Sequence, residues 1–250
     1  MTPRFVGKLA VVTGGNSGIG LATAKAFAHE GARVIITGRD PDTLHSAVQE
    51  VGYMATAHRS DICDLRQIAS LFAKIQEENA RVDVLFVNAG VLLHLPIESV
   101  TEADWDQILD TNLKGAFFTV QKALPLMSTG SVIVLTGSAA AGKAVPSAPV
   151  YAASKAGLCS LGRSLAAALV ERGIRVNVVS PAATETPIFR RAACLRSEGE
   201  YSMEKMIAGI PMKRMATPEE VAAVVLFLAS ESAAFVTGTN FLIDGGVASF

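Results

Sequence analysis

The sequence predicts a single-domain α/β protein, residues 1–250, with a doubly wound parallel sheet of roughly seven strands and helices on both faces. Three observations predict this fold. Short apolar runs alternate with stretches at helical spacing, the first run leads into a glycine-rich turn, and no long linker or repeat interrupts the pattern. With 250 residues, 50% of them hydrophobic and 18% charged, the chain can bury a large core.

Charge and cysteine content exclude several classes of function. A net charge of −1 and a pI near 6.4 provide no basic field for nucleic acid or an anionic membrane. Cys63, Cys159 and Cys194 match neither a disulfide framework nor a zinc-ligand pattern. No apolar run reaches the ~18 residues of a membrane span, and no metallohydrolase or nucleophile-elbow motif occurs. We therefore expect a cytoplasmic protein with small-molecule partners.

The first strand is expected over residues 9–12, followed by a glycine turn over 13–20 and a helix that stops at Gly31. This order brings backbone N–H groups and a helix N-terminus to a place where a pyrophosphate can bind. The glycine spacing is Gly-x-x-x-Gly-x-Gly, so a tight turn without a ligand is the alternative. The expected cofactor contacts are Gly14, Asn16, Ser17, Gly18, Ile19 and Gly20.

The second strand, residues 33–37, ends where the adenosine ribose of a dinucleotide would lie. An acidic residue there would accept hydrogen bonds from the 2′-hydroxyl of NAD, but this chain has Gly38 and Arg39. A guanidinium pairs with a 2′-phosphate, so the sequence favours NADP(H). Neutralisation of Arg39 by Asp40, or simple solvation of Arg39, would leave NAD(H) as the cofactor.

The next elements are a helix over residues 42–51 and a strand over 55–58 that leads to Asp61 and Ile62. We expect Asp61 to bond an exocyclic amine such as that of adenine or to cap a turn, and Ile62 to contact the cofactor. Asp64 is expected to cap the following helix.

The fourth strand, residues 82–87, is a buried apolar run that turns off at Asn88-Ala89-Gly90. Asn88 is expected either to tie neighbouring strand ends together or to contact the cofactor with Ala89 and Gly90.

A helix with a cap at Thr101 follows, and it contains Asn112. Because Asn competes for backbone hydrogen bonds within a helix, its position invites a functional reason. The fifth strand, residues 131–136, is followed by Ser138 at the edge where ligands gather in parallel sheets, although a solvated loop serine is the alternative.

Tyr151 and Lys155 lie four residues apart in a helix expected to end near Gly173. Positions i and i+4 share one helix face, and an ammonium beside a phenol favours the phenolate, which suits acid–base catalysis near neutrality. An ordinary helical pair with a solvated lysine is the alternative.

The rest of the chain predicts a strand over residues 176–179 with a turn at Pro181, a substrate lid at about 185–214, a helix capped at Thr217 and a strand over 241–243.

Together these motifs resemble the short-chain dehydrogenase/reductase family over nearly the whole chain. The resemblance rests on Thr13-Gly-x-x-x-Gly-x-Gly20, Asn88-Ala-Gly90, Asn112, Ser138, Tyr151-x-x-x-Lys155 and the Pro181 turn. It implies a pyridine-nucleotide oxidoreductase acting on a carbonyl or alcohol, usually a homotetramer built partly on the helix that carries Tyr151.

The resemblance also implies a role for each catalytic residue. Tyr151 would protonate the carbonyl oxygen, and Ser138 would hydrogen-bond it. Lys155 would hold the nicotinamide ribose and lower the pKa of Tyr151, while Asn112 would support a water that resupplies the proton.

After Pro181 the family often has Gly, whereas this chain has Ala182. The methyl group of Ala182 would narrow the substrate side of the pocket. Pro181, Ala182, Thr184 and Thr186 are the expected cofactor contacts in this turn.

The leading hypothesis is an NADPH-linked reductase of hydrophobic ketones or aldehydes, reversible as an alcohol dehydrogenase. Its pocket is expected to include Ala139, Ala140, Val145, Ile188, Phe189 and Met206. The alternative enzyme is a 3-oxoacyl-thioester reductase in which Arg190 and Arg191 meet the phosphate of a carrier. The alternative from another class is a non-catalytic nucleotide-binding scaffold.

Overall fold

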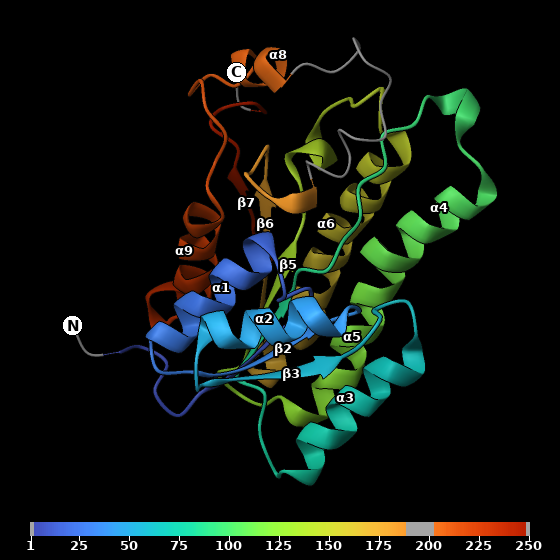
Figure 1. Ribbon diagram of the computed structural model, residues 1–250. Coiled ribbons are helices and arrows are strands. Elements are labelled where there is room, and N and C mark those ends of the chain that lie inside the picture. The colour runs from blue at the N-terminus through green and yellow to red at the C-terminus, as the bar shows by residue number, and fades with distance from the viewer. Residues whose placement is uncertain (1–2, 189–202, 249–250) are drawn as a thin grey trace.

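One seven-stranded parallel sheet forms the centre of the computed structural model, which describes residues 3–188 and 203–248 (Figure 1). The strand order is β3-β2-β1-β4-β5-β6-β7, so the chain reverses direction across the sheet between β1 and β4. Ligands bind at such switch points, beyond the carboxyl ends of the strands. The strands are β1 Leu9–Val12, β2 Arg33–Gly38, β3 Ala55–Arg59, β4 Val84–Val87, β5 Val132–Thr136, β6 Arg175–Pro181 and β7 Asn240–Ile243.

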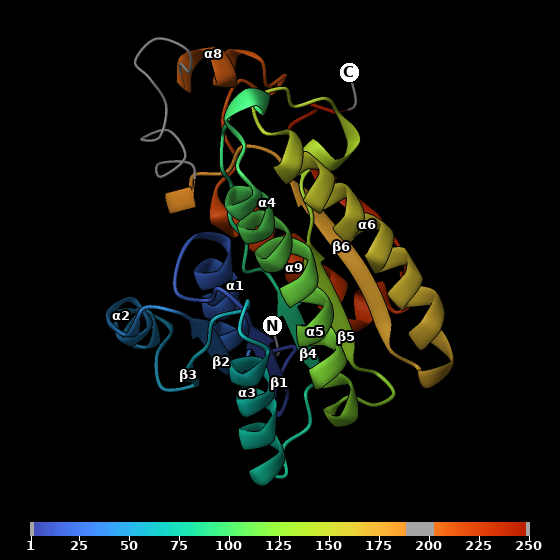
Figure 2. The same cartoon turned by 90° about the vertical axis from the view of Figure 1, so that its right-hand side faces the viewer.

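Helices cover both faces of the sheet, as the sequence predicts. Alternate strand residues face opposite sides; Val12 packs in a core beneath α1, α2 and α9, whereas Val11 packs in a second core beneath α3, α5 and α6. Figure 2 shows the second group of helices on the near side of the sheet. The helices are α1 Gly18–His29, α2 Pro41–Val51, α3 Leu65–Glu77, α4 Glu102–Leu109, α5 Gly115–Ala123, α6 Pro149–Leu169, α8 Met203–Ala208 and α9 Pro218–Ala229.

Several helices begin at the residues that the sequence indicates. The Asp64 carboxylate accepts a hydrogen bond from the Arg66 amide at the start of α3. Thr101 forms a capping box with Asp104 at α4. Thr217 forms another with Glu220 at α9. Each cap satisfies N–H groups that have no partner within the helix, which explains why these local signals were reliable.

The helix around Asn112 differs from the simple helix that the sequence predicts. Between α4 and α5 the chain makes a π-helical turn, Asp110–Lys114, and Asn112 lies within it, almost fully buried. Gly115 follows, where a Cβ atom would lie 2.4 Å from the Ile62 carbonyl oxygen. The wider turn therefore accompanies a close approach of the helix to the loop after β3, and π-turns are frequent at functional sites.

The long helix α6 approaches the sheet closely through a glycine, and its leucines are buried to different extents. Leu158 is buried, but Leu161 and Leu165 are only partly covered by the same core. At Gly162 a Cβ atom would lie 2.5 Å from Cγ2 of Val178 in β6. A glycine is therefore needed for α6 to lie this close to the strand.

The segment from Glu185 to Arg214 leaves and rejoins the fold at one place. Thr184 and Ala216 form an isolated parallel bridge, and the Glu185 amide donates to the Ala216 carbonyl over 3.0 Å. Residues 189–202 of the expected lid, including Phe189, Arg190, Arg191 and Cys194, lie outside the described residues. Among the described helices, none is long and apolar enough to cross a membrane.

The contact between α6 and β6 generates a first prediction. Gly162→Ala should destabilise the protein by about 1–3 kcal/mol, because the added methyl group meets a stiff, buried valine. Thermal or urea unfolding of the nucleotide-free protein measures the effect. Gly142→Ala is the matched control, since no atom lies within 4 Å of a Cβ atom built there. Equal stability of both variants and the parent would contradict the close packing of α6.

Candidate active site

A cavity of about 930 Å³ lies beyond the carboxyl ends of β1, β2, β4, β5 and β6. It brings together nearly all of the predicted site residues. Its lining includes Gly14, Asn16, Ser17, Gly18, Ile19, Arg39, Asp61, Ile62, Asn88, Ala89, Gly90, Ser138, Tyr151, Lys155, Pro181, Ala182, Thr184 and Thr186. Gly20 and Asn112 do not line this cavity and instead support residues that do.

The glycine turn after β1 is shaped by residues without side chains. Gly14 and Gly18 have φ angles of 62° and 52°, in the left-handed region that favours glycine. At Gly20 a Cβ atom would lie 2.2 Å from the Gly14 carbonyl oxygen and 2.6 Å from Nδ2 of Asn88. Gly20 therefore allows the turn to close on itself beside the cavity.

Asn88 ties together the ends of three neighbouring strands, one of the two roles expected for it. Its Nδ2 atom donates to the carbonyl oxygens of Thr13 and Gly14 over 3.1 and 3.2 Å. Its Oδ1 atom accepts from the Thr136 hydroxyl over 3.4 Å, at the end of β5. These bonds hold the glycine turn against the strand that leads to Ser138.

Ser138, Tyr151 and Lys155 meet at the same wall of the cavity. Ser138 and Tyr151 both line this wall, and Ser138 lies close enough to the Tyr151 phenol to act on its pKa. The Lys155 Nζ atom lies 5.9 Å from the centre of the Tyr151 ring and donates to the Thr136 carbonyl over 2.7 Å. The side chains at positions i and i+4 of α6 thus lie together, as the sequence indicates.

Burial controls the protonation of this group. It raises the pKa of Tyr151, although the hydrogen bond from Ser138 opposes the shift, and it lowers the pKa of Lys155 to about 8. The net direction for Tyr151 is upward in this arrangement, because desolvation of the phenol is the largest cause. The two shifts have one physical cause, since burial disfavours whichever form carries charge.

Asn112 lies outside the cavity lining and supports the site through hydrogen bonds. Its Nδ2 atom donates to the Val91 carbonyl and to the Ser154 hydroxyl, each over 3.0 Å, and its Oδ1 atom accepts from the Val91 amide over 2.8 Å. At the neighbouring Gly90, a Cβ atom would lie 3.2 Å from Asn112 Oδ1 and 3.4 Å from Lys155 Nζ. Asn112 therefore joins the loop after β4 to α6 beside Lys155.

At the far end of the cavity Asp40 does not neutralise Arg39 through its carboxylate. That carboxylate caps α2 by accepting from the Thr43 amide over 2.8 Å, and the cap lowers the pKa of Asp40. Asp61 also caps a turn, since its Oδ1 atom accepts from the Cys63 amide over 2.9 Å, while it lines the cavity as well.

The turn after Pro181 closes the cavity opposite the glycine turn. The Ala182 amide donates to the Ile243 carbonyl over 3.1 Å, so this turn is attached to β7. The Thr184 and Thr186 hydroxyls donate to the carbonyls of Ala182 and Thr184 over 3.2 and 3.1 Å. A Cβ atom at Gly18 would lie 3.0 Å from Cγ2 of Thr186. The two turns are therefore in direct contact.

Comparison with known proteins identifies the family. A family model described as enoyl-(acyl carrier protein) reductase matches residues 14–248. An oxidoreductase of Sarocladium schorii is 41% identical over 247 residues, covering 98% of this chain and 97% of the relative. The chain belongs to the short-chain dehydrogenase/reductase family.

Other members of the family share its length and shape. A 3-oxoacyl-acyl-carrier-protein reductase of Thermotoga maritima is 36% identical over 98% of this chain and 99% of its own. The Pseudomonas aeruginosa RhlG complex with NADP has a TM-score of 0.91, with 32% identity over 99% of this chain and 100% of that one. A Brucella melitensis 3-ketoacyl-acyl-carrier-protein reductase with NADH has a TM-score of 0.87, with 30% identity over 98% and 99%.

Membership places the chain among oxidoreductases that act on alcohol or carbonyl groups and bind NAD or NADP. No group of three or more histidine, cysteine, aspartate or glutamate side chains that could hold a metal occurs among the described residues.

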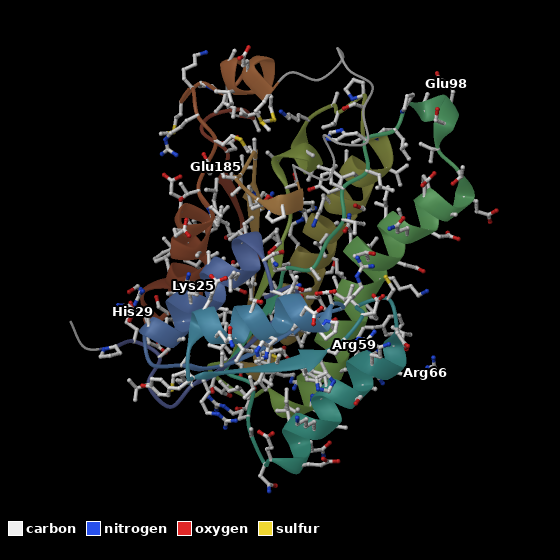
Figure 3. All side chains as sticks on the ribbon, in the orientation of Figure 1. Lys25, His29, Arg59, Arg66, Glu98 and Glu185 are labelled. Carbon is white, nitrogen blue, oxygen red and sulfur yellow. The ribbon has the colours of Figure 1, made fainter. Side chains whose placement is uncertain are left out.

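Several side chains in or near the site were not predicted from the sequence. Arg59, at the end of β3 (Figure 3), does not line the cavity but donates through Nε to the Arg39 carbonyl over 3.0 Å, which holds the loop that carries Arg39. On the substrate side, the expected Ala139, Ala140, Val145, Ile188 and Met206 line the cavity, but so do Lys143, Ser147 and His94. Only strand pairing and loop contacts bring these residues in, so no local pattern signals them.

Proposed function

We propose that this protein is an NADP(H)-dependent reductase of ketones or aldehydes, reversible as an alcohol dehydrogenase, with catalysis and cofactor binding in one domain. The observation that carries this proposal is the meeting of Ser138, Tyr151 and Lys155 at a cavity that also contains the glycine turn. Residues 185–214 are proposed as the substrate lid, because the bridge at Thr184 and Ala216 closes their base beside this cavity.

The residues present fit a dinucleotide. Gly14 and Gly18 expose backbone at the start of α1, where a pyrophosphate would meet N–H groups and the positive end of the helix. Lys155 would hold the nicotinamide ribose, and the turn from Pro181 to Thr186 would meet the nicotinamide carboxamide and the phosphates. A bound nicotinamide would supply the hydride.

The side chains supply the proton and stabilise the charge. Tyr151 keeps its proton at neutral pH, so it can donate that proton to a carbonyl oxygen, and Ser138 can donate a hydrogen bond to the same oxygen. Lys155, with a pKa of about 8, is mostly charged at pH 7 and stabilises the phenolate as it forms. General acid catalysis accelerates a reaction by a factor on the order of 10² to 10⁴. One hydrogen-bond donor to the developing oxyanion lowers the activation free energy by about 3 kcal/mol.

Asn112 is proposed to hold the loop after β4 in place and so to fix the position of Lys155. Its amide contacts join Val91 to Ser154 on α6, next to Lys155. Any resupply of protons through Lys155 depends on this arrangement.

Arg39 supports the preference for NADP(H). It lines the cavity, and the Asp40 carboxylate is engaged as a helix cap. Arg59 donates to the Arg39 backbone carbonyl and so supports the loop that carries Arg39. NAD(H) is the alternative, since related structures are described with NADP and with NADH.

A 3-oxoacyl-thioester reductase is the second candidate function. The matched family model and the Thermotoga maritima relative are both described as acyl-carrier-protein reductases. Arg190 and Arg191, the residues expected to meet the phosphate of a carrier, lie outside the described residues. A non-catalytic scaffold is less well supported, because the three residues needed for turnover are all present and adjacent.

A cytoplasmic homotetramer is part of this proposal. Trp105 on α4 and Phe117 on α5 are 49% and 37% exposed, and α4 packs beside α6. Exposed aromatic side chains at this face suit an interface between copies of the chain.

Tyr151→Phe tests the chemistry. The variant should bind NADPH as the parent does but lose at least about 10²-fold in kcat, because the proton donor is removed while the ring remains. Fluorescence titration with NADPH and a ketone, aldehyde and acyl-thioester panel measure the two properties. Tyr53→Phe is the control, since Tyr53 is 97% exposed. Retained turnover would remove Tyr151 from the mechanism.

Arg39→Ala tests the cofactor preference. We expect KM for NADPH to rise roughly tenfold or more and KM for NADH to change little, because only NADPH carries the 2′-phosphate. Arg66→Ala is the control, because the Arg66 side chain is 93% exposed on α3. A parent enzyme that prefers NADH would contradict the role of Arg39. Substitution of Gly38 is a less clean test, because its Cβ atom would lie 2.8 Å from the Asn16 side chain.

A further inference from the structure

Two loops beside the active site meet through polar side chains that the proposed reaction does not use. His94 lies in the loop after β4, and Ser147 lies just before α6. The His94 Nδ1 atom is 3.3 Å from the Ser147 hydroxyl oxygen. Both residues line the cavity that contains Ser138 and Tyr151. They therefore form a polar part of a substrate region whose expected residues are apolar.

The side chains of this pair are not needed to join the two loops. The Leu95 amide already donates to the Ser147 carbonyl over 3.0 Å, which connects the loops through their backbones. A serine hydroxyl has one donor and two acceptor sites, so its bond to His94 leaves capacity for a ligand. The imidazole restricts how the hydroxyl is oriented, which prepares it for a partner in the cavity.

We propose that His94 and Ser147 form a second anchor in the substrate pocket, which hydrogen-bonds an oxygen atom other than that of the reacting carbonyl. This inference rests on the proposed reductase function and names its substrate class: ketones or aldehydes that carry a second, uncharged oxygen in a hydroxyl, carbonyl or ester group. Ser138 and Tyr151 serve the reacting oxygen, so the anchor acts on substrate choice.

The anchor suits a neutral oxygen better than an anion. A hydroxyl and an imidazole offer both donor and acceptor sites, which suits a neutral oxygen. A carboxylate would be stabilised mainly by a cationic side chain. Lys143, an exposed cation that shortly precedes Ser147 in the sequence, lines the same cavity. An anionic substrate would therefore depend on Lys143 instead.

Matched ketones test the proposal. Ethyl acetoacetate and 2-heptanone have chains of equal length, as do 4-hydroxy-2-butanone and 2-pentanone, and only the first member of each pair carries oxygen beyond the ketone, in an ester or a hydroxyl group. We expect the parent enzyme with NADPH to prefer the oxygenated member by roughly tenfold or more in kcat/KM. Ser147→Ala and His94→Leu should remove that preference by raising KM for the oxygenated ketone much more than KM for the alkyl ketone. His94→Gln should retain part of it.

Two further variants sharpen the result. Ser99→Ala, at an exposed serine in the 3-10 helix before α4, is the control and should keep the preference. Loss of the preference in Lys143→Ala alone would overturn the proposal in favour of an anchor at the Lys143 ammonium group. A parent enzyme without the preference, or variants that lose activity equally on both ketones, would overturn it while leaving the reductase function intact. No NADPH oxidation with any carbonyl compound would overturn both.

Discussion

The site depends on a lysine ammonium group that is almost removed from water. Lys155 is 4% exposed, and its Nζ atom donates to the Thr136 carbonyl at the end of β5. Burying a charge is costly unless acceptors surround it, and here the cost appears as a pKa lowered to about 8. The region around the ammonium is close-packed, since a Cβ atom at Gly90 would lie 3.2 Å from Asn112 Oδ1 and 3.4 Å from Lys155 Nζ, and α6 brings Tyr151 to the same wall. A cation this close to neutrality can stabilise a phenolate and still exchange its proton.

The sheet places the other parts of the site around this lysine. The order reverses between β1 and β4, so the glycine turn after β1 and the loop after β4 open beside one another. Asn88 bonds both to the glycine turn and to Thr136, whose carbonyl accepts from Lys155. A short chain of hydrogen bonds thus connects the expected phosphate cradle to the catalytic wall. The two parts of the cavity are therefore held together by contacts between strand ends.

Much of this arrangement could be predicted from the sequence because the signals are local. Buried strands read as apolar runs, and the caps at Asp64, Thr101 and Thr217 need only the next three residues. Asn112 was conspicuous as a poor helix residue, but the π-turn that accommodates it depends on packing against another loop. Arg59 supports the backbone of Arg39 through strand pairing, and His94 reaches the site through a loop contact. Such long-range contacts leave no periodic pattern. The raised pKa of Tyr151 was missed for the same reason, since burial cannot be counted from neighbours in the sequence.

We infer that Lys155 is a buried cation whose pKa of about 8 lies close to neutral pH, beside the proposed proton donor Tyr151. Nuclear magnetic resonance of protein carrying ¹³C-labelled lysine measures it directly, with the Lys155 signal assigned by its loss in Lys155→Met. We expect this signal to titrate with a pKa of about 8, apart from the other lysines. A pKa of 10.5 or higher, the ordinary range for a solvated lysine, would show that the Lys155 ammonium is not destabilised by burial.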